Sequence, residues 1–320
     1  MKNYFKNLSL IFFSIIFTLF FIEFFLIIKS KFLIDYDVEM WKYSKLLKRE
    51  SINPKINHVH VKNSSAKLQG VIIQTDSIGA RGDNKNLHRW KLSDNKILIL
   101  GSSVTLGWGV EEKNTMVSKL NQISIKNKKS WHFLNAGVGN YNTERYVSNY
   151  FENLSMLNPD TLIIQFFLND PENLNNEKGN LITRNFHVGV LLWKYYNSII
   201  DNVKFTEIYD YYLNVYNDKN LKKTLYYLKK IKKHCDLTNK KKCLVLYTPD
   251  IQFLGIEKYD LFEKKIKLIS RKANLPFYSF TKPLLNEKKR GIKLKNKYKD
   301  NHPNQLAHNI MAVSLFNYLK

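Results

Sequence analysis

The sequence is poor in cysteine and in acidic residues. It has two cysteines in 320 residues, and 27 Asp and Glu against 51 Lys and Arg. No metal-ligand cluster and no nucleotide-binding glycine motif is evident, so we expect no metal and no cofactor. The net charge of +24 comes without a recognised nucleic-acid-binding motif, and the lysines are scattered. We therefore expect no nucleic-acid partner, although a basic surface attracts anionic lipids and acidic polymers.

A cleavage site is also missing after the one long hydrophobic run. Residues 8–28 are almost entirely apolar, about the length that a helix needs to cross a bilayer. No small-residue A-x-A pattern follows, so we expect a retained single-pass anchor rather than a cleaved signal peptide. The usual orientation of such an anchor leaves the following domain in the periplasm or outside the cell. Glu23 lies inside the run, and we expect it to reach the interface or to be protonated.

The two cysteines lie close together in the sequence. Cys235 ends a predicted helix and Cys243 begins a predicted strand. They are near enough to form a disulfide in an oxidising compartment, and two unpaired, buried thiols are the alternative.

We divide the chain into an anchor at 1–30, a polar and irregular lead-in at 31–95, and a domain at 96–320. Within the lead-in, residues 71–74 predict a strand. His58 and His60 alternate along an extended stretch and so share a face. A third metal ligand is lacking, and we interpret them as two solvated surface histidines.

Apolar strands and amphipathic helices alternate after residue 95, which predicts a mostly parallel sheet with helices on both faces. Residues 171–220 interrupt the alternation. We interpret them as an insertion that forms either a lid or a membrane-facing surface. The aromatic helix of this insertion, at 188–200, should be packed core. Asn114 is the expected N-cap of the first helix. The predicted strands are 97–100, 131–134, 162–168, 243–247 and 277–280, and the predicted helices are 116–123, 146–154, 220–235, 260–272 and 303–319.

Four chemically useful residues follow the ends of these elements. Ser103, Gly137 and Asn169 come just after three apolar strands, and His302 comes at the start of the last helix. Ligands of open parallel sheets bind outside the carboxyl ends of the strands, so the four residues should meet at one edge.

These residues suit acyl transfer to water. Ser103 would be the nucleophile, His302 the base that takes its proton, and Asp300 the carboxylate that orients the imidazole. The backbone N–H groups of Ser103 and Gly137 and the side-chain amide of Asn169 would stabilise the oxyanion.

At these positions the chain resembles the SGNH hydrolases, also called the GDSL family. The resemblance covers residues 70–320, poorly within the insertion, and implies a three-layer α/β/α sandwich with a five-stranded sheet. The segments around residues 76–81 and 107–110 look like those of a membrane-anchored bacterial branch. The four blocks are Gly101-Ser-Ser-Val-Thr-Leu-Gly107, Asn135-Ala-Gly-Val-Gly139, Leu168-Asn-Asp170 and Asp300-Asn-His-Pro-Asn304.

Two positions depart from the family pattern. Ser102 replaces the aspartate that gives the GDSL motif its name, but that residue does not transfer protons in the family's mechanism. The usual acid lies three residues before the histidine, where this chain has Lys299, whereas Asp300 lies two before it. A Ser103–His302 dyad with reduced activity is the alternative to a triad with Asp300. His308, further along the last block, should be structural.

The resemblance implies a membrane-tethered serine esterase that hydrolyses or transfers O-acyl groups. The expected substrate is an acylated small molecule or polysaccharide, with O-acetyl groups of envelope carbohydrate favoured. One alternative is a lipid esterase or thioesterase, with the aromatic helix at 188–200 lining an acyl pocket. Another is a non-catalytic protein that binds an envelope polymer.

Overall fold

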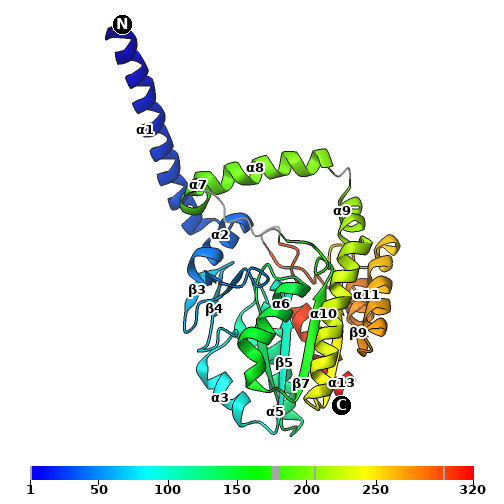
Figure 1. Cartoon of the computed structure of the whole chain (residues 1–320). Helices are drawn as coiled ribbons and strands as arrows, with labels where there is room; N and C mark the ends of the chain where they lie inside the picture. Colours follow the sequence, from blue (N-terminus) through cyan, green and yellow to red (C-terminus); the bar gives the residue numbers. More distant parts are fainter. Residues whose placement is uncertain (1, 175–180, 205–206, 298–299) are drawn as a thin grey trace.

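The computed structural model describes residues 2–174, 181–204, 207–297 and 300–320. Lys299 and parts of the insertion therefore lie outside the described residues. Figure 1 shows a long N-terminal helix, α1, that projects from a compact α/β body.

The body is built on a five-stranded parallel sheet, as the alternation of strands and helices predicts. The strand order is β6-β5-β7-β8-β9, so the chain starts near one edge and then winds to the other. The predicted strands are all present, three of them extended by a few residues. Their bounds are β5 Asn95–Gly101, β6 Trp131–Gly137, β7 Thr161–Phe167, β8 Lys242–Thr248 and β9 Phe277–Ser279.

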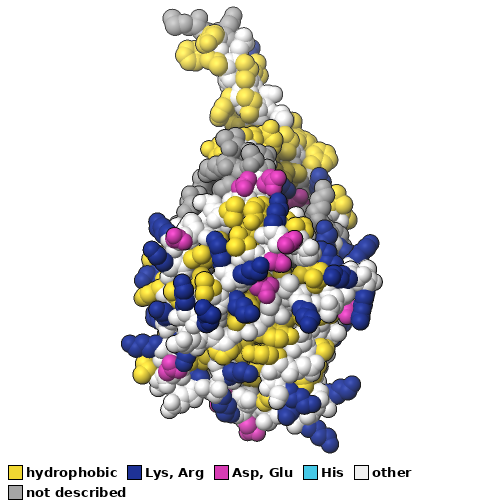
Figure 2. All heavy atoms as spheres, turned by 90° about the vertical axis from the view of Figure 1, so that its right-hand side faces the viewer, with side chains coloured by type: hydrophobic (Ala, Val, Ile, Leu, Met, Phe, Trp, Pro, Cys, Tyr) yellow, Lys and Arg dark blue, Asp and Glu magenta, His cyan; other side chains and the backbone are white. Residues whose placement is uncertain are grey.

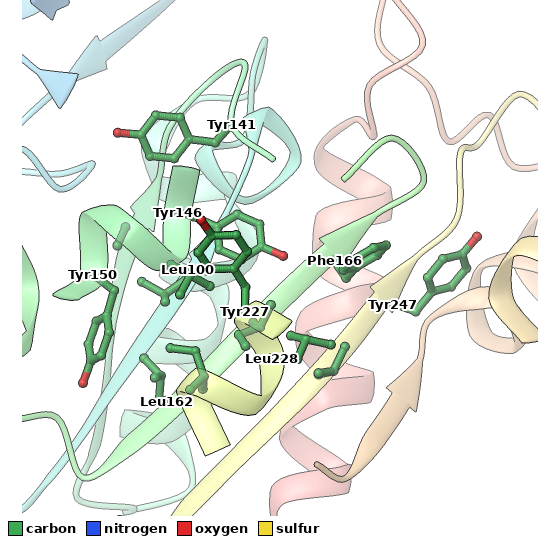
Figure 3. Close-up of a cluster of buried hydrophobic side chains, with 14 of the residues drawn as sticks. Leu100, Tyr141, Tyr146, Tyr150, Leu162, Phe166, Tyr227, Leu228 and Tyr247 are labelled. Carbon is green, nitrogen blue, oxygen red and sulfur yellow. The ribbon is translucent and has the colours of Figure 1, made fainter. Parts of the chain in front are cut away.

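Two hydrophobic cores lie on opposite faces of the sheet. Along β5, Leu98 and Leu100 contribute to one core, and Ile97 and Ile99 to the other, because side chains alternate along a strand. Figure 3 shows the first core, where Tyr146 and Tyr227 pack over the central strands. The first face carries α3 Asn84–Leu92, α6 Thr143–Asn149, α10 Asp218–Leu237 and α11 Asp260–Lys272, and the second carries α5 Met116–Lys126, α12 Thr281–Lys289 and α13 Gln305–Leu319.

Several element ends differ from the sequence prediction. Thr115, not Asn114, caps α5, because its hydroxyl accepts the N–H of Ser118. The predicted helix at 146–154 is divided, since α6 ends at Asn149 and gives way to a π-helical turn and then a 3-10 turn. The short elements of the body are α4 Ser103–Leu106, α9 Ile208–Val215, the π-helix η2 Tyr150–Leu154, and the 3-10 helices η1 Glu112–Asn114, η3 Ser155–Leu157 and η4 Glu257–Tyr259.

The lead-in is more regular than predicted. Two small antiparallel sheets, β1-β2 and β3-β4, follow a helix, and β4 confirms the predicted strand. His58 and His60 share a face of β2, but they are buried rather than solvated as predicted. The lead-in elements are α2 Tyr36–Leu46, β1 Lys48–Glu50, β2 His58–His60, β3 Ser65–Leu68 and β4 Val71–Gln74.

Among the described residues, three further helices belong to the anchor and the insertion. α1 spans Lys2–Phe32, and its stretch Tyr4–Phe32 is long and apolar enough to cross a membrane. In the insertion, α7 Leu181–Asn185 leads into α8 His187–Lys204, which Figure 1 shows running from the base of α1 over one end of the body toward α9. The prediction that the aromatic stripe of α8 is packed core is wrong, because most of its large side chains are exposed.

A disulfide links Cys235 at the end of α10 to Cys243 in β8, with the Cα atoms 6.5 Å apart. Of the two alternatives left open by the sequence, the structure has the paired one.

Candidate active site

Ser103 lies where β5 passes into α4, at the carboxyl edge of the sheet. As the first residue of a helix, it has a backbone N–H without an intrahelical acceptor. The turn is tight: a Cβ at Gly101 would overlap the side chain of Thr105 and lie 2.8 Å from the carbonyl oxygen of Gln165. A residue larger than glycine at position 101 would therefore not fit this turn.

His302 and Asp300 complete a hydrogen-bonded series with Ser103. The Ser103 Oγ is 2.7 Å from Nε2 of His302, and Nδ1 of His302 is 2.6 Å from Oδ1 of Asp300. The same Asp300 oxygen accepts the backbone N–H of His302 at 3.0 Å. The two-residue spacing therefore suffices for the carboxylate to reach the imidazole. Asp300 is almost completely buried, so its attraction for the imidazole is weakly screened by solvent.

Asn296 supports the carboxylate from its other side. Its Nδ2 group donates to Oδ2 of Asp300 at 3.3 Å and to the carbonyl oxygen of Trp108 at 2.8 Å. The loop containing Trp108 is held in turn by the buried guanidinium of Arg81, which donates to the carbonyl oxygens of Leu106, Gly107 and Val110. No sequence motif points to Asn296, which lies outside the four blocks.

Tyr36, at the start of α2, covers the imidazole. Its ring stacks on that of His302, with 6.1 Å between centroids and 26° between planes. Burial, together with the charges of Asp300 and Asp37, raises the pKa of the Tyr36 phenol, so its hydroxyl stays neutral. No sequence signal indicated that the lead-in contributes to the site.

Gly137 ends β6 beside α4, and its position explains why it is glycine. A Cβ there would lie 2.7 Å from the carbonyl carbon of Thr105 and closer still to the backbone nitrogen of Leu106. Its N–H, an expected oxyanion donor, donates to Oδ1 of Asn135 at 3.0 Å. It could bind an oxyanion only if the Asn135 side chain moved. Asn140 follows in the left-handed conformation (φ 64°) and is exposed.

Asn169 follows β7 in a turn, and its side-chain Oδ1 is buried without a hydrogen-bond partner among the described residues. Since no described residue holds Oδ1, the amide is not fixed through its oxygen and is able to turn toward a ligand. Asp170, the next residue, is buried, and burial raises its pKa well above the usual value.

The other histidines near the site are structural. His308 accepts the N–H of Met116 through Nδ1 at 3.0 Å and so caps α5, while burial lowers its pKa to about 3. His58 Nε2 interacts with the carbonyl oxygen of Gly139, and His60 Nε2 lies 2.6 Å from the Tyr43 hydroxyl, which accepts the Gly139 N–H. The lead-in therefore supports the loop after β6. No group of three potential metal ligands occurs among the described residues.

Neither a protein-family model nor a curated protein matches this chain. Among solved structures, it is similar to a two-domain esterase active on acetylated mannans (17% identity, 74% of this chain and 52% of that chain, TM-score 0.46). It is also similar to a catalytic mutant of an acetylxylan esterase from Geobacillus stearothermophilus (15% identity, 70% and 94%, TM-score 0.47). A third is a psychrotrophic esterase from Pseudoalteromonas sp. (15% identity, 71% and 97%, TM-score 0.45). The chain spans about half the length of the first.

Proposed function

We propose that this chain is a membrane-tethered serine esterase of the SGNH type, with Ser103, His302 and Asp300 as its catalytic residues. The observation that carries the proposal is the hydrogen-bonded series from Ser103 Oγ through both ring nitrogens of His302 to Asp300. Ser103 is 199 residues from His302 in the sequence, and the fold brings the two side chains into contact.

In the proposed reaction, Ser103 Oγ attacks the ester carbonyl carbon while His302 Nε2 takes its proton. The tetrahedral oxyanion is stabilised by the Ser103 N–H and the Asn169 side-chain amide. Gly137 joins them only if its N–H leaves Asn135. Collapse of this intermediate breaks the ester C–O bond, and His302 returns the proton to the leaving alkoxide. Water, or an acceptor hydroxyl in a transferase, then releases the acyl group from Ser103 by the same steps.

We propose O-acyl groups of envelope carbohydrate, O-acetyl groups in particular, as the substrate. The anchor α1 and the Cys235–Cys243 disulfide support a domain in an oxidising compartment outside the cytoplasm. The apolar side chains of α8 are exposed rather than gathered around Ser103. This arrangement does not favour the alternative of an acyl pocket lined by that helix.

The test is hydrolysis of p-nitrophenyl acetate and longer-chain esters by the full chain in detergent. Ser103→Ala and His302→Ala should lower kcat by at least about 10³-fold, because each removes a member of the triad. Ser102→Ala is the matched control: the neighbouring hydroxyl is buried without a partner among the described residues, and its loss should leave kcat unchanged. Preference for long chains would indicate a lipid esterase, and no turnover of any ester would favour a binding protein.

A further inference from the structure

The apolar side of helix α8 faces away from the body, whereas the apolar side of a helix in a soluble domain faces the core. Leu192, Tyr195, Tyr196 and Ile199 recur at i, i+3, i+4 and i+7, which places them on one face. These four residues and Trp193 are each between 48% and 69% exposed. A surface helix of a soluble domain normally buries such a stripe against the core.

The opposite side of α8, which carries Lys194 and Val190, faces the protein instead. Lys194 Nζ lies 2.5 Å from Oδ2 of Asp37 and 3.8 Å from Oδ2 of Asp35, at the start of α2. Val190, also on this side, is buried. The helix is thus held to the body by these ion pairs and by the burial of Val190, while its five exposed aromatic and aliphatic side chains point away from the body.

The start of α8 is fixed to α1 by Glu23. One carboxylate oxygen of Glu23 accepts the backbone N–H of His187 at 2.9 Å and lies 2.8 Å from its Nδ1, and the other accepts the N–H of Val188 at 3.0 Å. Free N–H groups at a helix start favour a carboxylate. Glu23, the acidic residue within the apolar run, therefore forms the contact between α1 and the start of α8, which we call the joint.

The position of this joint along α1 matches the surface of a bilayer. The apolar stretch Tyr4–Phe32 has 29 residues, or about 43 Å of helix, whereas a hydrocarbon core is about 30 Å thick. Glu23 lies about 13 Å before Phe32 along the helix. If Tyr4 lies at one boundary of the hydrocarbon, Glu23 and the start of α8 lie at the other. Figure 2 shows hydrophobic side chains along α1 and at its base.

We infer that the outward face of α8, made of Leu192, Trp193, Tyr195, Tyr196 and Ile199, docks on a lipid bilayer beside α1. Tryptophan and tyrosine favour the head-group region, where apolar rings and polar tips are both accommodated. Two contacts, one spanning and one lying in the surface, hold the domain in a fixed orientation. Because α2 contacts α8 and also carries Tyr36 over His302, the catalytic edge then lies on the membrane side. This inference rests on the proposed role of α1 as a membrane anchor.

The test uses the full chain in vesicles of phosphatidylcholine and phosphatidylglycerol whose acyl chains carry bromine, a quencher of tryptophan fluorescence. Bromine near the head groups should quench more strongly than bromine near the chain ends, and Trp193→Phe should remove most of this difference. Trp131→Phe is the matched control, because Trp131 lies at the amino end of β6, away from the catalytic edge. Equal quenching of the parent and Trp193→Phe would overturn the inference.

A second variant guards against indirect effects. Leu192→Ser with Tyr196→Ser should reduce the quenching of Trp193 at least twofold and leave hydrolysis of p-nitrophenyl acetate unchanged, since neither residue touches the site. Co-flotation of the parent with the vesicles tests the anchor separately. If the parent did not co-float with the vesicles, both the anchor and the docking of α8 would be overturned. If the parent co-floated but Trp193 were not quenched, the docking alone would be overturned. Ester hydrolysis in the same samples reports the proposed chemistry independently.

Discussion

At the scale of single residues, the catalytic triad depends on side chains that come from other parts of the chain. Ser103, Asn169 and His302 follow strand ends or precede the last helix, so periodicity alone brings them to one edge. Asn296 and Tyr36 reach the same site through side chains whose sequence neighbourhoods carry no pattern. Such contacts depend on the tertiary path of the chain, which hydrophobic periodicity does not encode.

Asn296 should act as a positioning residue for Asp300. Asn296→Ala removes one hydrogen bond to a charged group, typically about 1.5–3 kcal/mol, so kcat should fall roughly 10- to 100-fold while KM changes little. Steady-state kinetics on p-nitrophenyl acetate measures both constants. Asn301→Ala is the control, because this exposed amide bonds Gln252 instead of the triad. Equal losses in both variants would contradict the assignment.

Tyr36 should matter through its ring rather than its hydroxyl. Tyr36→Phe keeps the stack on His302, and we expect kcat/KM within about twofold of the parent. Tyr36→Ala exposes the imidazole to water, and kcat/KM should fall roughly tenfold, because a water-excluded site strengthens the interactions of the triad. A Phe variant as impaired as the Ala variant would show that the hydroxyl is the active group.

At the scale of elements, the strands and major helices of the body could be predicted because their hydrophobic residues repeat at the correct periods. Besides the element ends, two predictions were wrong. The lead-in was predicted to be irregular but forms two small sheets, because its strands are only three or four residues long and show no clear alternation in the sequence. The stripe of α8 was predicted to be core, because periodicity identifies an apolar face without indicating what covers it.

The disulfide between α10 and β8 should stabilise the body. The two cysteines are eight residues apart in the sequence. In the chain-entropy model, a loop of this size restricts the unfolded chain and so stabilises the folded state by about 2–3 kcal/mol. Replacing both Cys235 and Cys243 by Ser should lower the free energy of unfolding by this amount in urea titrations. The reduced parent should match the double variant, and a variant as stable as the oxidised parent would contradict the prediction.

At the scale of the whole molecule, folding keeps several histidines neutral. Burial lowers the pKa of His60 to about 4 and of His132 to about 4, against an ordinary value of 6.5. As pH falls, the unfolded chain takes up a proton on such a histidine before the folded chain does. The contribution of the neutral histidine to stability is therefore complete above pH 6.5 and is lost as pH falls toward 4. Asp76 acts in the opposite direction, because burial raises its pKa to about 6. The pH dependence of the parent alone is therefore a sum of opposing terms.

The difference in stability between the parent and the variant His132→Gln isolates the contribution of one histidine. In the parent, His132 lies 2.9 Å from Oδ1 of Asn86 and titrates, whereas His132→Gln does not titrate. Relative to this variant, the parent should lose stability as pH falls from 6.5 to 4. Urea unfolding at a series of pH values measures the difference. A gap between the two proteins that is constant over this range would contradict the prediction.

The three-layer architecture could be predicted from the order of elements, whereas the relation of the body to its anchor could not. The joint at Glu23 pairs a residue of the hydrophobic run with a helix start 164 positions later, a contact that no local pattern announces. Lys and Arg are spread over the visible face of the body in Figure 2, in line with their scatter along the sequence.

The central claim is that Ser103 is an activated nucleophile, and covalent labelling tests it most directly. The full chain would be treated with a fluorophosphonate and digested, and the adduct located by mass spectrometry. We predict one stoichiometric adduct on Ser103, absent in Ser103→Ala, strongly reduced in His302→Ala and retained in Ser102→Ala. An unlabelled parent, or an adduct that persists in Ser103→Ala, would contradict the account.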